Sequence, residues 1–192
     1  DHLQTRPIAG TRPRGGSALL DIELTKELMN SDKEKAEHLM LVDLERNDIS
    51  KVCKPGTVKV DEMMTIETYA HVHHIVSNIS GEKKENVMPG DVIKSVFPGG
   101  TITGCPKVRC MEILGELEKQ GRGPYTGSFG YITHSGDMDL NILIRTILKE
   151  NNDIFFRAGG GIVADSIPQN ETLETEAKAS GMLKAVGSFK NE

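Results

Sequence analysis

The sequence lacks the features by which proteins usually hold nucleic acids. Only 4% of its 192 residues are aromatic, and it contains no run of five or more Lys and Arg residues. Bases stack on aromatic rings and phosphates attract clustered cations, so we expect no nucleic-acid partner. The formal net charge of −5 comes from mixed acidic and basic residues. A small anionic ligand would therefore need cations placed locally.

Cysteine is scarce as well, and the three that occur suggest no shared role. Cys53, Cys105 and Cys110 have neither the C-x-x-C spacing of a zinc site nor the even number of a disulfide framework. No apolar run is long enough to cross a membrane, so no membrane partner is expected. We predict a protein of a reducing compartment, the cytoplasm. Because the chain opens without Met, at "DHLQTRPIAG", we also expect a fragment of a longer protein.

Hydrophobic periodicity predicts the helices. Apolar residues recur at helical spacing over residues 18–48, where Ser31 or Asp32 can cap a second helix. A helix is predicted at 106–120, with Pro in its first turn, and another at 170–186.

Alternation of apolar and polar residues predicts the strands. It is clear in residues 56–81, and residues 123–166 hold three strand-like runs that resemble an antiparallel meander. Placed among the helices, these strands favour one domain in which helices cover a largely antiparallel sheet.

Two segments each carry a pair of carboxylates at helical spacing. Glu34-x-x-Glu37 and Glu171-x-x-Glu174 would each present two carboxylates on one face of a helix. Two such faces brought together would suit Mg²⁺, which prefers hard oxygen ligands. The alternative is that both pairs are solvated helix charge.

Adjacent histidines lie in a predicted strand. In "AHVHHIVS" the side chains of His73 and His74 would point to opposite faces of the sheet. An imidazole that faced a pocket could act as an acid or a base near neutral pH, or it could be structural. Because adjacent side chains on a strand diverge, zinc is not expected.

Few cations are placed to hold an anion. Gly99-x-x-x-x-Gly104 begins like a phosphate loop, but Lys107 comes two positions too late. Arg145 lies in the apolar run "NILIRTIL", which predicts a strand in which the guanidinium needs a carboxylate partner. Lys178 follows Glu174 by one helical turn.

A second glycine-rich segment, "RAGGGIVADSIPQ", has the spacing of a dinucleotide fingerprint. Pro168 comes too soon for the helix that should carry the pyrophosphate, so we reject that interpretation. The glycines either let backbone N–H groups approach an anion or form a tight turn.

Seven segments together resemble the C-terminal part of the chorismate-utilising enzymes, over essentially the whole chain. They are "RPIAGTRPRG", "AEHLMLVDLERNDISKV", "VHHIVS", "FPGGTITGCPKVRCMEI", "GSFGYI", "DMDLNILIRT" and "AGGGIVADSIPQNETLETEAKA". The resemblance implies an α/β fold in which two antiparallel sheets are sandwiched between helices. It also implies that residues 1–192 are the C-terminal part of a chorismate-binding catalytic domain whose N-terminal part is missing.

The resemblance assigns roles to individual residues. It implies His74, Glu34 and Thr101 as catalytic residues, with His74 beside the ring carbon that loses its substituent. It implies Mg²⁺ as the cofactor, with Glu34 and Glu171 holding metal-bound water. The implied magnesium ligands are Glu37, Glu174 and Glu171. The implied substrate-binding residues are Tyr131, Arg145, Gly160, Gly161, Lys178 and Ala9.

The resemblance leaves the product open between two members of the family. Ala9 stands where one class of aminodeoxychorismate synthase has a lysine nucleophile, and alanine there is typical of anthranilate synthase. "TITGCPK" and "GDMDLNILIRT" are closer to aminodeoxychorismate synthase, a subclass of which also has alanine. We favour that subclass, with chorismate as substrate and ammonia from a glutamine amidotransferase partner. A non-catalytic chorismate-binding module is the alternative from another class.

Overall fold

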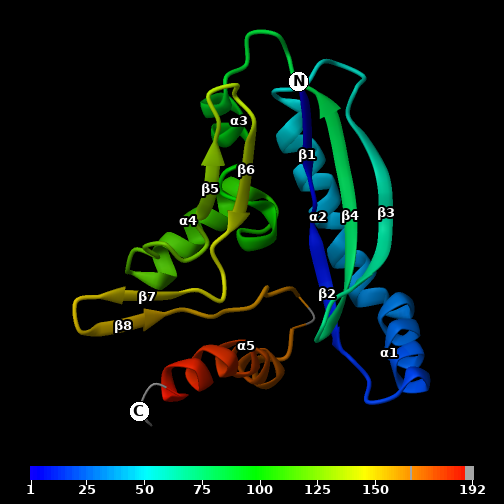
Figure 1. Cartoon of the computed structure of the whole chain (residues 1–192), viewed down its shortest axis with the longest axis vertical. Coiled ribbons are helices and arrows are strands. Elements are labelled where there is room, and N and C mark those ends of the chain that lie inside the picture. Colours follow the sequence, from blue (N-terminus) through cyan, green and yellow to red (C-terminus); the bar gives the residue numbers. More distant parts are fainter. Residues whose placement is uncertain (165, 189–192) are drawn as a thin grey trace. The chain divides into compact units, whose positions relative to one another are not determined.

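The computed structural model describes residues 1–164 and 166–188. The chain divides into two compact units, Asp1–Leu114 and Gly115–Glu192. Figure 1 shows the elements in chain order. Over the described residues, no helix is both long and apolar enough to cross a membrane.

The sheet of the first unit is built around one long strand. β4 (Val72–Glu82) pairs with β1 (His2–Thr5), β2 (Ile8–Pro13) and β3 (Lys59–Thr68), and every pairing is antiparallel. The register of β2 shifts between Ala9 and Thr11, which marks a β-bulge at Gly10. Buried and partly buried residues alternate at the start of β4, and from Ile75 onward both faces are mostly covered. The strands predicted in residues 56–81 are confirmed.

Helices cover this sheet. α1 (Ala18–Asn30) and α2 (Asp32–Ser50) are separated only by Ser31, whose side chain accepts from Glu34 N–H and so caps α2. α3 (Pro89–Val96), the short 3₁₀ turn η1 (Gly100–Ile102) and α4 (Lys107–Glu118) follow the sheet. The apolar face of α2 packs on the sheet, in a core formed by Val42, Ile49, Cys53 and Ile79. The helices predicted in residues 18–48 and 106–120 are confirmed. The helix α3 and the strands β1 and β2 were not predicted from the sequence.

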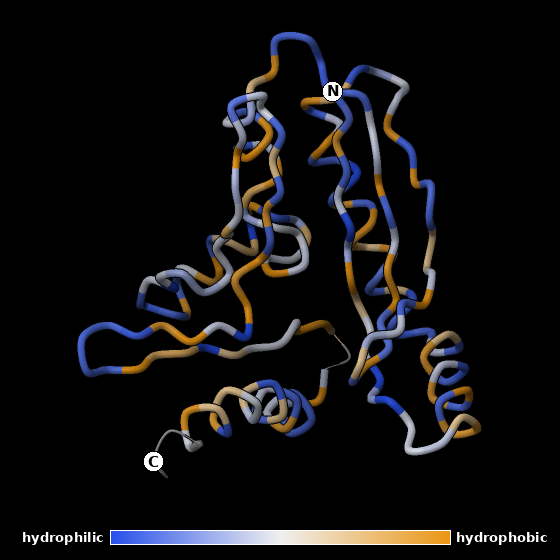
Figure 2. Tube along the Cα trace, in the orientation of Figure 1, coloured by the Kyte–Doolittle hydropathy of each residue, from blue (hydrophilic) through white to orange (hydrophobic). Residues whose placement is uncertain are grey.

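The second unit contains two hairpins and a helix. β5 (Ser128–Ile132) pairs with β6 (Met138–Ile142), β7 (Ile147–Glu150) pairs with β8 (Asp153–Phe156), and α5 runs from Pro168 to Ser188. Figure 2 shows the turn between β7 and β8 as strongly hydrophilic, as expected for an exposed hairpin end. The helix predicted at 170–186 is confirmed.

The single meander predicted for residues 123–166 is wrong in its pairing. The structure has two separate two-stranded sheets instead. Between them Ile144 N–H donates to Ile142 O, and Arg145 adopts a left-handed conformation with φ +50°. This local turn interrupts the ladder, because a residue at positive φ leaves the extended conformation of a strand. The mixed α/β class with antiparallel sheets is nevertheless confirmed.

Candidate functional site

Three of the predicted site residues of the first unit meet at Gly10, in the bulge of β2. Glu34, in the first turn of α2, points here: a Cβ on Gly10 would lie 3.1 Å from Glu34 Oε2. His74 Nδ1 lies 3.3 Å from the Gly10 carbonyl oxygen. Ala9, immediately before, is buried opposite Ile75. Gly10 has φ +79°, so the backbone conformation and the close approach of Glu34 both favour glycine.

Glu34 forms an ion pair with Arg12. Arg12 Nη1 lies 3.4 Å from Glu34 Oε1, and Arg12 Nε donates to Glu27 at 2.9 Å. Glu37 follows one turn later on α2 and is also half-buried. The two carboxylates therefore lie on one face of α2, as their spacing predicts, and Glu34 is the one that approaches β2.

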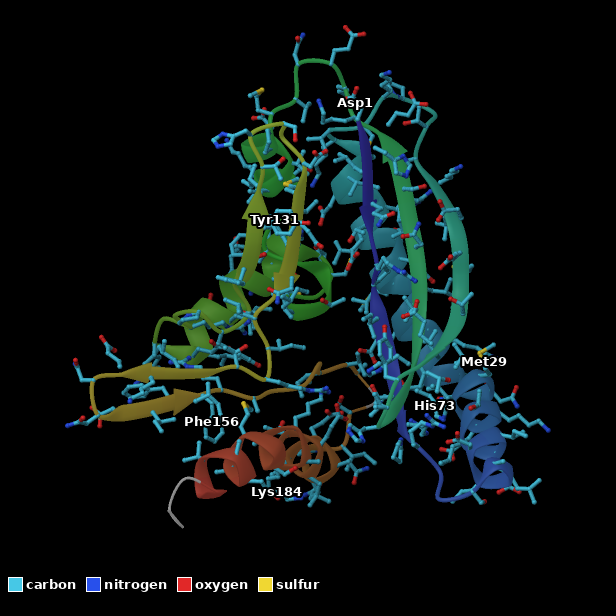
Figure 3. All side chains as sticks on the ribbon, in the orientation of Figure 1. Asp1, Met29, His73, Tyr131, Phe156 and Lys184 are labelled. Atoms are coloured by element: carbon cyan, nitrogen blue, oxygen red, sulfur yellow. The ribbon has the colours of Figure 1, made fainter. Side chains whose placement is uncertain are left out.

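His74 and His73 point to opposite faces of β4, as predicted. His73 is buried: its Nε2 lies 2.9 Å from Asp21 Oδ1 and its Nδ1 lies 2.9 Å from Thr68 Oγ1. Figure 3 labels His73 near α1. His74 is half-buried, and its Nδ1 lies 2.9 Å from Thr11 Oγ1. If Nδ1–H is donated to the Gly10 carbonyl, Nε2 is the basic nitrogen and can exchange a proton.

Thr101 lies in the 3₁₀ turn of the glycine-rich segment. Its Oγ1 is buried and has no hydrogen-bond partner among the described residues. A buried hydroxyl is normally satisfied, so this atom can still accept or donate a hydrogen bond. The segment packs against α2, where a Cβ on Gly100 would lie 2.7 Å from Leu44 Cδ2.

In the second unit, predicted residues gather around Gly160. A Cβ there would lie 3.5 Å from Glu171 Oε2, 3.8 Å from Glu174 Oε1 and 3.8 Å from Lys178 Nζ. Lys178 Nζ also pairs with Glu174 Oε1 at 2.7 Å. Glu171 is 9% exposed, and its Oε1 accepts from Ser166 Oγ at 2.7 Å. The absent side chain of Gly160 therefore leaves a small cradle lined by two carboxylates and one ammonium.

The sequence interpretation missed one neighbour of this cradle. A Cβ on Gly159 would lie 3.0 Å from the hydroxyl of Tyr125. Lys178 Nζ lies 3.4 Å from Gly159 O. The only signal for Tyr125 is its place in "GPYTGS", an ordinary turn sequence that indicates no site.

The remaining predicted residues of the second unit lie at the surface. Tyr131 is 59% exposed on β5, opposite Asp139 (Figure 3). Arg145 is exposed between β6 and β7, so its predicted place in an apolar strand is wrong. It makes no hydrogen bond or ion pair with the described residues. Gly161 is exposed beside Gly160, between β8 and α5.

The carboxylate pairs are chemically suited to Mg²⁺. Each pair offers hard oxygen donors beside a glycine, at Gly10 and at Gly160. Among the described residues no three His, Cys, Asp or Glu side chains are grouped closely enough to hold a metal ion. Either pair alone would leave coordination positions to water and to ligand oxygens, which is how Mg²⁺ is usually bound.

Two further ionisable groups on α2, Glu45 and His38, are buried. Burial raises the pKa of the Glu45 carboxyl, although a 2.5 Å hydrogen bond from Thr5 Oγ1 acts in the opposite direction. Burial also lowers the pKa of His38, whose Nε2 lies 2.6 Å from Ser77 Oγ. A buried His38 therefore stays neutral more readily than an exposed histidine.

Comparisons with known proteins bear on the whole chain. The family model described as chorismate binding enzyme matches residues 1–184. The chain is 53% identical over 184 residues to anthranilate synthase component 1 of Aquifex aeolicus (strain VF5), covering 96% of the chain and 37% of that protein. It is 52% identical over 184 residues to aminodeoxychorismate synthase component 1 of Bacillus subtilis (strain 168), covering 96% and 39% respectively.

A solved structure has the same fold. The crystal structure of anthranilate synthase component I from Streptococcus pneumoniae TIGR4 matches with a TM-score of 0.81 and 40% identity, covering 94% of this chain and 40% of that one. The chain thus spans well under two thirds of the length of each of these relatives. The match over residues 1–184, together with identities above one half, shows that the chain belongs to the chorismate binding enzyme family.

Proposed function

We propose that the protein containing this chain aminates chorismate to 4-amino-4-deoxychorismate, the precursor of p-aminobenzoate. The reaction would use Mg²⁺, with ammonia supplied by a glutamine amidotransferase partner. The observation that carries this proposal is the grouping of Glu171, Glu174 and Lys178 around Gly160 in a chain of this family. Chorismate is a dianion, and this grouping combines a cation with carboxylates that suit a divalent metal.

The substrate carboxylates need donors. The ammonium of Lys178 and the backbone N–H groups of Gly160 and Gly161 can each donate to a carboxylate oxygen. Arg145, which has no partner among the described residues, can bind a carboxylate through two parallel N–H hydrogen bonds. The exposed Tyr131 hydroxyl can donate a third hydrogen bond to the same carboxylate. These donors would bind and orient the substrate.

Glu37, Glu171 and Glu174 are the residues that would hold Mg²⁺, with Glu34 beside its water. When bound, the ion withdraws charge from the substrate carboxylate that it contacts. Glu171 is also fixed by Ser166, so its second oxygen has a defined direction.

Proton transfer falls to His74. Ammonia adds at C2 of the ring while the C4 hydroxyl takes a proton and leaves as water. A second ammonia then adds at C4 and expels the C2 amino group as ammonia. Because Gly10 O and Thr11 Oγ1 lie at Nδ1, the other ring nitrogen can serve the reaction, and a proton taken up on Nε2 can pass to the leaving hydroxyl.

Anthranilate is the second candidate product, and Ala9 is the observation that favours it. A buried alanine in this position of β2 offers no nucleophile to the ring. After the first amination, loss of the enolpyruvyl group as pyruvate would then give anthranilate. Relatives with both names match this chain almost equally well.

The test is product identification. The full-length protein is incubated with chorismate, Mg²⁺ and ammonium at alkaline pH, where more of the ammonium is free ammonia. Aminodeoxychorismate as the product supports the proposal, whereas anthranilate as sole product moves the assignment to the second candidate. Binding of chorismate without turnover, even with the amidotransferase present, would identify a non-catalytic module.

A further inference from the structure

Lys107 joins two segments of the first unit through a buried ion pair. Its ammonium contacts the Asp48 carboxylate and donates to Val96 O at 3.3 Å. The side chain of Lys107 is 15% exposed and that of Asp48 only 3%. Lys107 begins α4 and Asp48 lies near the end of α2, so the pair fixes the end of residues 97–106 against α2.

Other contacts of this segment lead to the same helix. Ser95 Oγ, just before the segment, donates to the Asp48 carbonyl oxygen. In the middle of the segment, Gly100 lies against Leu44, where even a methyl group would collide. The segment is therefore held on α2 at its beginning, its middle and its end, and Lys107 makes the charged contact.

Two hydrogen bonds within the segment shape its turn. Ile102 N–H donates to Gly99 O at 3.3 Å, and Thr103 Oγ1 donates to the same oxygen at 3.0 Å. These bonds shape the 3₁₀ turn that carries Thr101, but they do not attach it to another element. The contacts with α2 described above attach this turn to the rest of the unit.

The same helix carries the carboxylates of the first unit. Residues 37, 44 and 48 follow one another by seven and four positions, so they share a face of α2. Asp48 comes eleven residues after Glu37, which is about 16 Å along the helix axis. Because α2 is one uninterrupted helix, holding the segment at Asp48 also sets the distance from Thr101 to Glu37.

We propose that Lys107 is a positioning residue that fixes Thr101 relative to the carboxylates of α2, and so shapes the surface that contacts the chorismate ring. The proposal rests on the proposed function, together with the catalytic role that the family resemblance implies for Thr101. The lysine itself touches no substrate and acts only through the segment that it anchors.

Lys51 provides a matched control. It pairs with the same carboxylate, at 2.9 Å from Asp48 Oδ1, but it directly follows α2 as its C-cap residue, and its side chain is 55% exposed. Lys51→Met therefore removes one ion pair from Asp48 without releasing the segment. Lys107→Met leaves Asp48 with one cation and detaches the segment. The double variant Asp48→Asn with Lys107→Met detaches the segment without leaving a buried charge, so it stays usable if Lys107→Met fails to fold.

The first measurement is amide hydrogen exchange in the full-length protein. We expect peptides covering residues 99–104 to exchange about tenfold faster in Lys107→Met and in the double variant, because the segment opens locally, and at the wild-type rate in Lys51→Met. Unchanged exchange in the double variant would overturn the proposal, whatever the protein does with chorismate.

The second measurement is steady-state turnover of chorismate. We expect kcat/KM to fall by about 10-fold to 100-fold in the double variant, since misplacement by about 1 Å can have an effect of that size. Lys51→Met should stay within about twofold of wild type, and Lys107→Arg should recover part of the loss by restoring the pair. Equal losses in the Lys51 and Lys107 variants would overturn the proposal. Absence of turnover in the wild type would instead overturn the proposed function, and the exchange data would still decide the anchoring role.

Discussion

At the scale of single residues, Glu174 and Glu37 carry the strongest prediction about chemistry. Glu174→Gln keeps the shape of the side chain but removes the charge that pairs with Lys178 and would hold Mg²⁺. We expect each Gln variant to lower Mg²⁺ affinity by more than about tenfold, because loss of an outer partner alone has that effect, and to abolish turnover. Activity is measured against Mg²⁺ concentration in the full-length protein.

Glu176 supplies the control for this prediction. It is exposed on α5 two residues after Glu174, so it lies on another face of the helix. Glu176→Gln should therefore keep wild-type activity and Mg²⁺ dependence. A fully active Glu174→Gln variant would remove Glu174 from the metal site.

Asp21 carries a prediction about acid stability. Its carboxylate accepts hydrogen bonds from Arg14, from His73 and from Gly15 N–H, and these hold its pKa well below the usual range. A carboxyl whose pKa is depressed in the folded state stabilises that state above its unfolded pKa of about 3.9. The stabilisation declines as the pH falls below that value and disappears once the folded-state carboxyl is protonated.

The Asp21→Asn variant tests this dependence. We expect it to be less stable than wild type at pH 7 and to lose less stability on acidification, so that the two converge at low pH. The free energy of unfolding is measured with urea between about pH 7 and pH 2. Glu23→Gln, an exposed neighbour on α1, should follow the wild-type curve. Parallel curves for Asp21→Asn and wild type would contradict the assigned role.

Single residues also show which structural features can be predicted from local sequence and which cannot. The opposite orientations of His73 and His74 follow from the period of a strand, so they were predictable. The partner of His73 was not, because Asp21 is 52 positions away and nothing local links them. Arg145 was misplaced because an apolar run predicts a strand, whereas a positive φ at one residue ends it.

At the scale of elements, the cap of α2 connects stability with the candidate site. Ser31 Oγ accepts from Glu34 N–H, and Glu34 is itself a site residue. Ser31→Ala should destabilise the protein by about 0.5–1 kcal/mol and fray the turn that orients Glu34. We therefore expect a lower melting temperature together with a raised Mg²⁺ requirement.

The cap of α1 gives a matched comparison. Ser17 Oγ accepts from Leu20 N–H at 3.3 Å in the same way, but the first turn of α1 carries no site residue. Ser17→Ala should lower the melting temperature to a similar degree and leave the Mg²⁺ requirement unchanged. If both variants change the Mg²⁺ requirement equally, general destabilisation is the cause and the link to Glu34 is wrong.

The predictability of the elements followed their length and regularity. α2 and β4 are long and strongly periodic, so both were predicted. α3 has eight residues and η1 three, too few for a periodic signal. The division of the predicted meander into two hairpins depends on which strands pair, and pairing is a property of contacts between distant residues.

At the scale of the whole molecule, the order of seven motifs predicted the family, and the comparisons confirmed it. Local patterns alone predicted only helices on an antiparallel sheet. Helical spacing indicated the carboxylate pairs and the place of Lys178, whereas the approach of Gly10 and Gly160 to these side chains joins separate segments and could not be predicted from spacing.

The source of ammonia gives a prediction for the complete enzyme. We expect turnover with glutamine to require the amidotransferase, as a subunit or a fused domain, and turnover with ammonium at alkaline pH to proceed without it. A glutamine analogue that alkylates the amidotransferase thiol should abolish only the first activity. The rates of chorismate consumption with each nitrogen source provide the measurement, and loss of both activities would show that the analogue acts on this chain as well.

The bulge at Gly10 has a further consequence for how β2 can change. In a regular strand residues 9 and 11 would show the same face, but here Ala9 pairs with Ile75 and Thr11 pairs with His74, which face opposite ways. The bulge at Gly10 therefore shifts the alternation of the strand by one residue, so that Ala9 and Thr11 face opposite sides of the sheet. A change at residue 9 alters the buried surface that Ile75 faces and leaves the contact of Thr11 with His74 in place. Because of the bulge, residue 9 can be substituted without a change in the contact between Thr11 and His74.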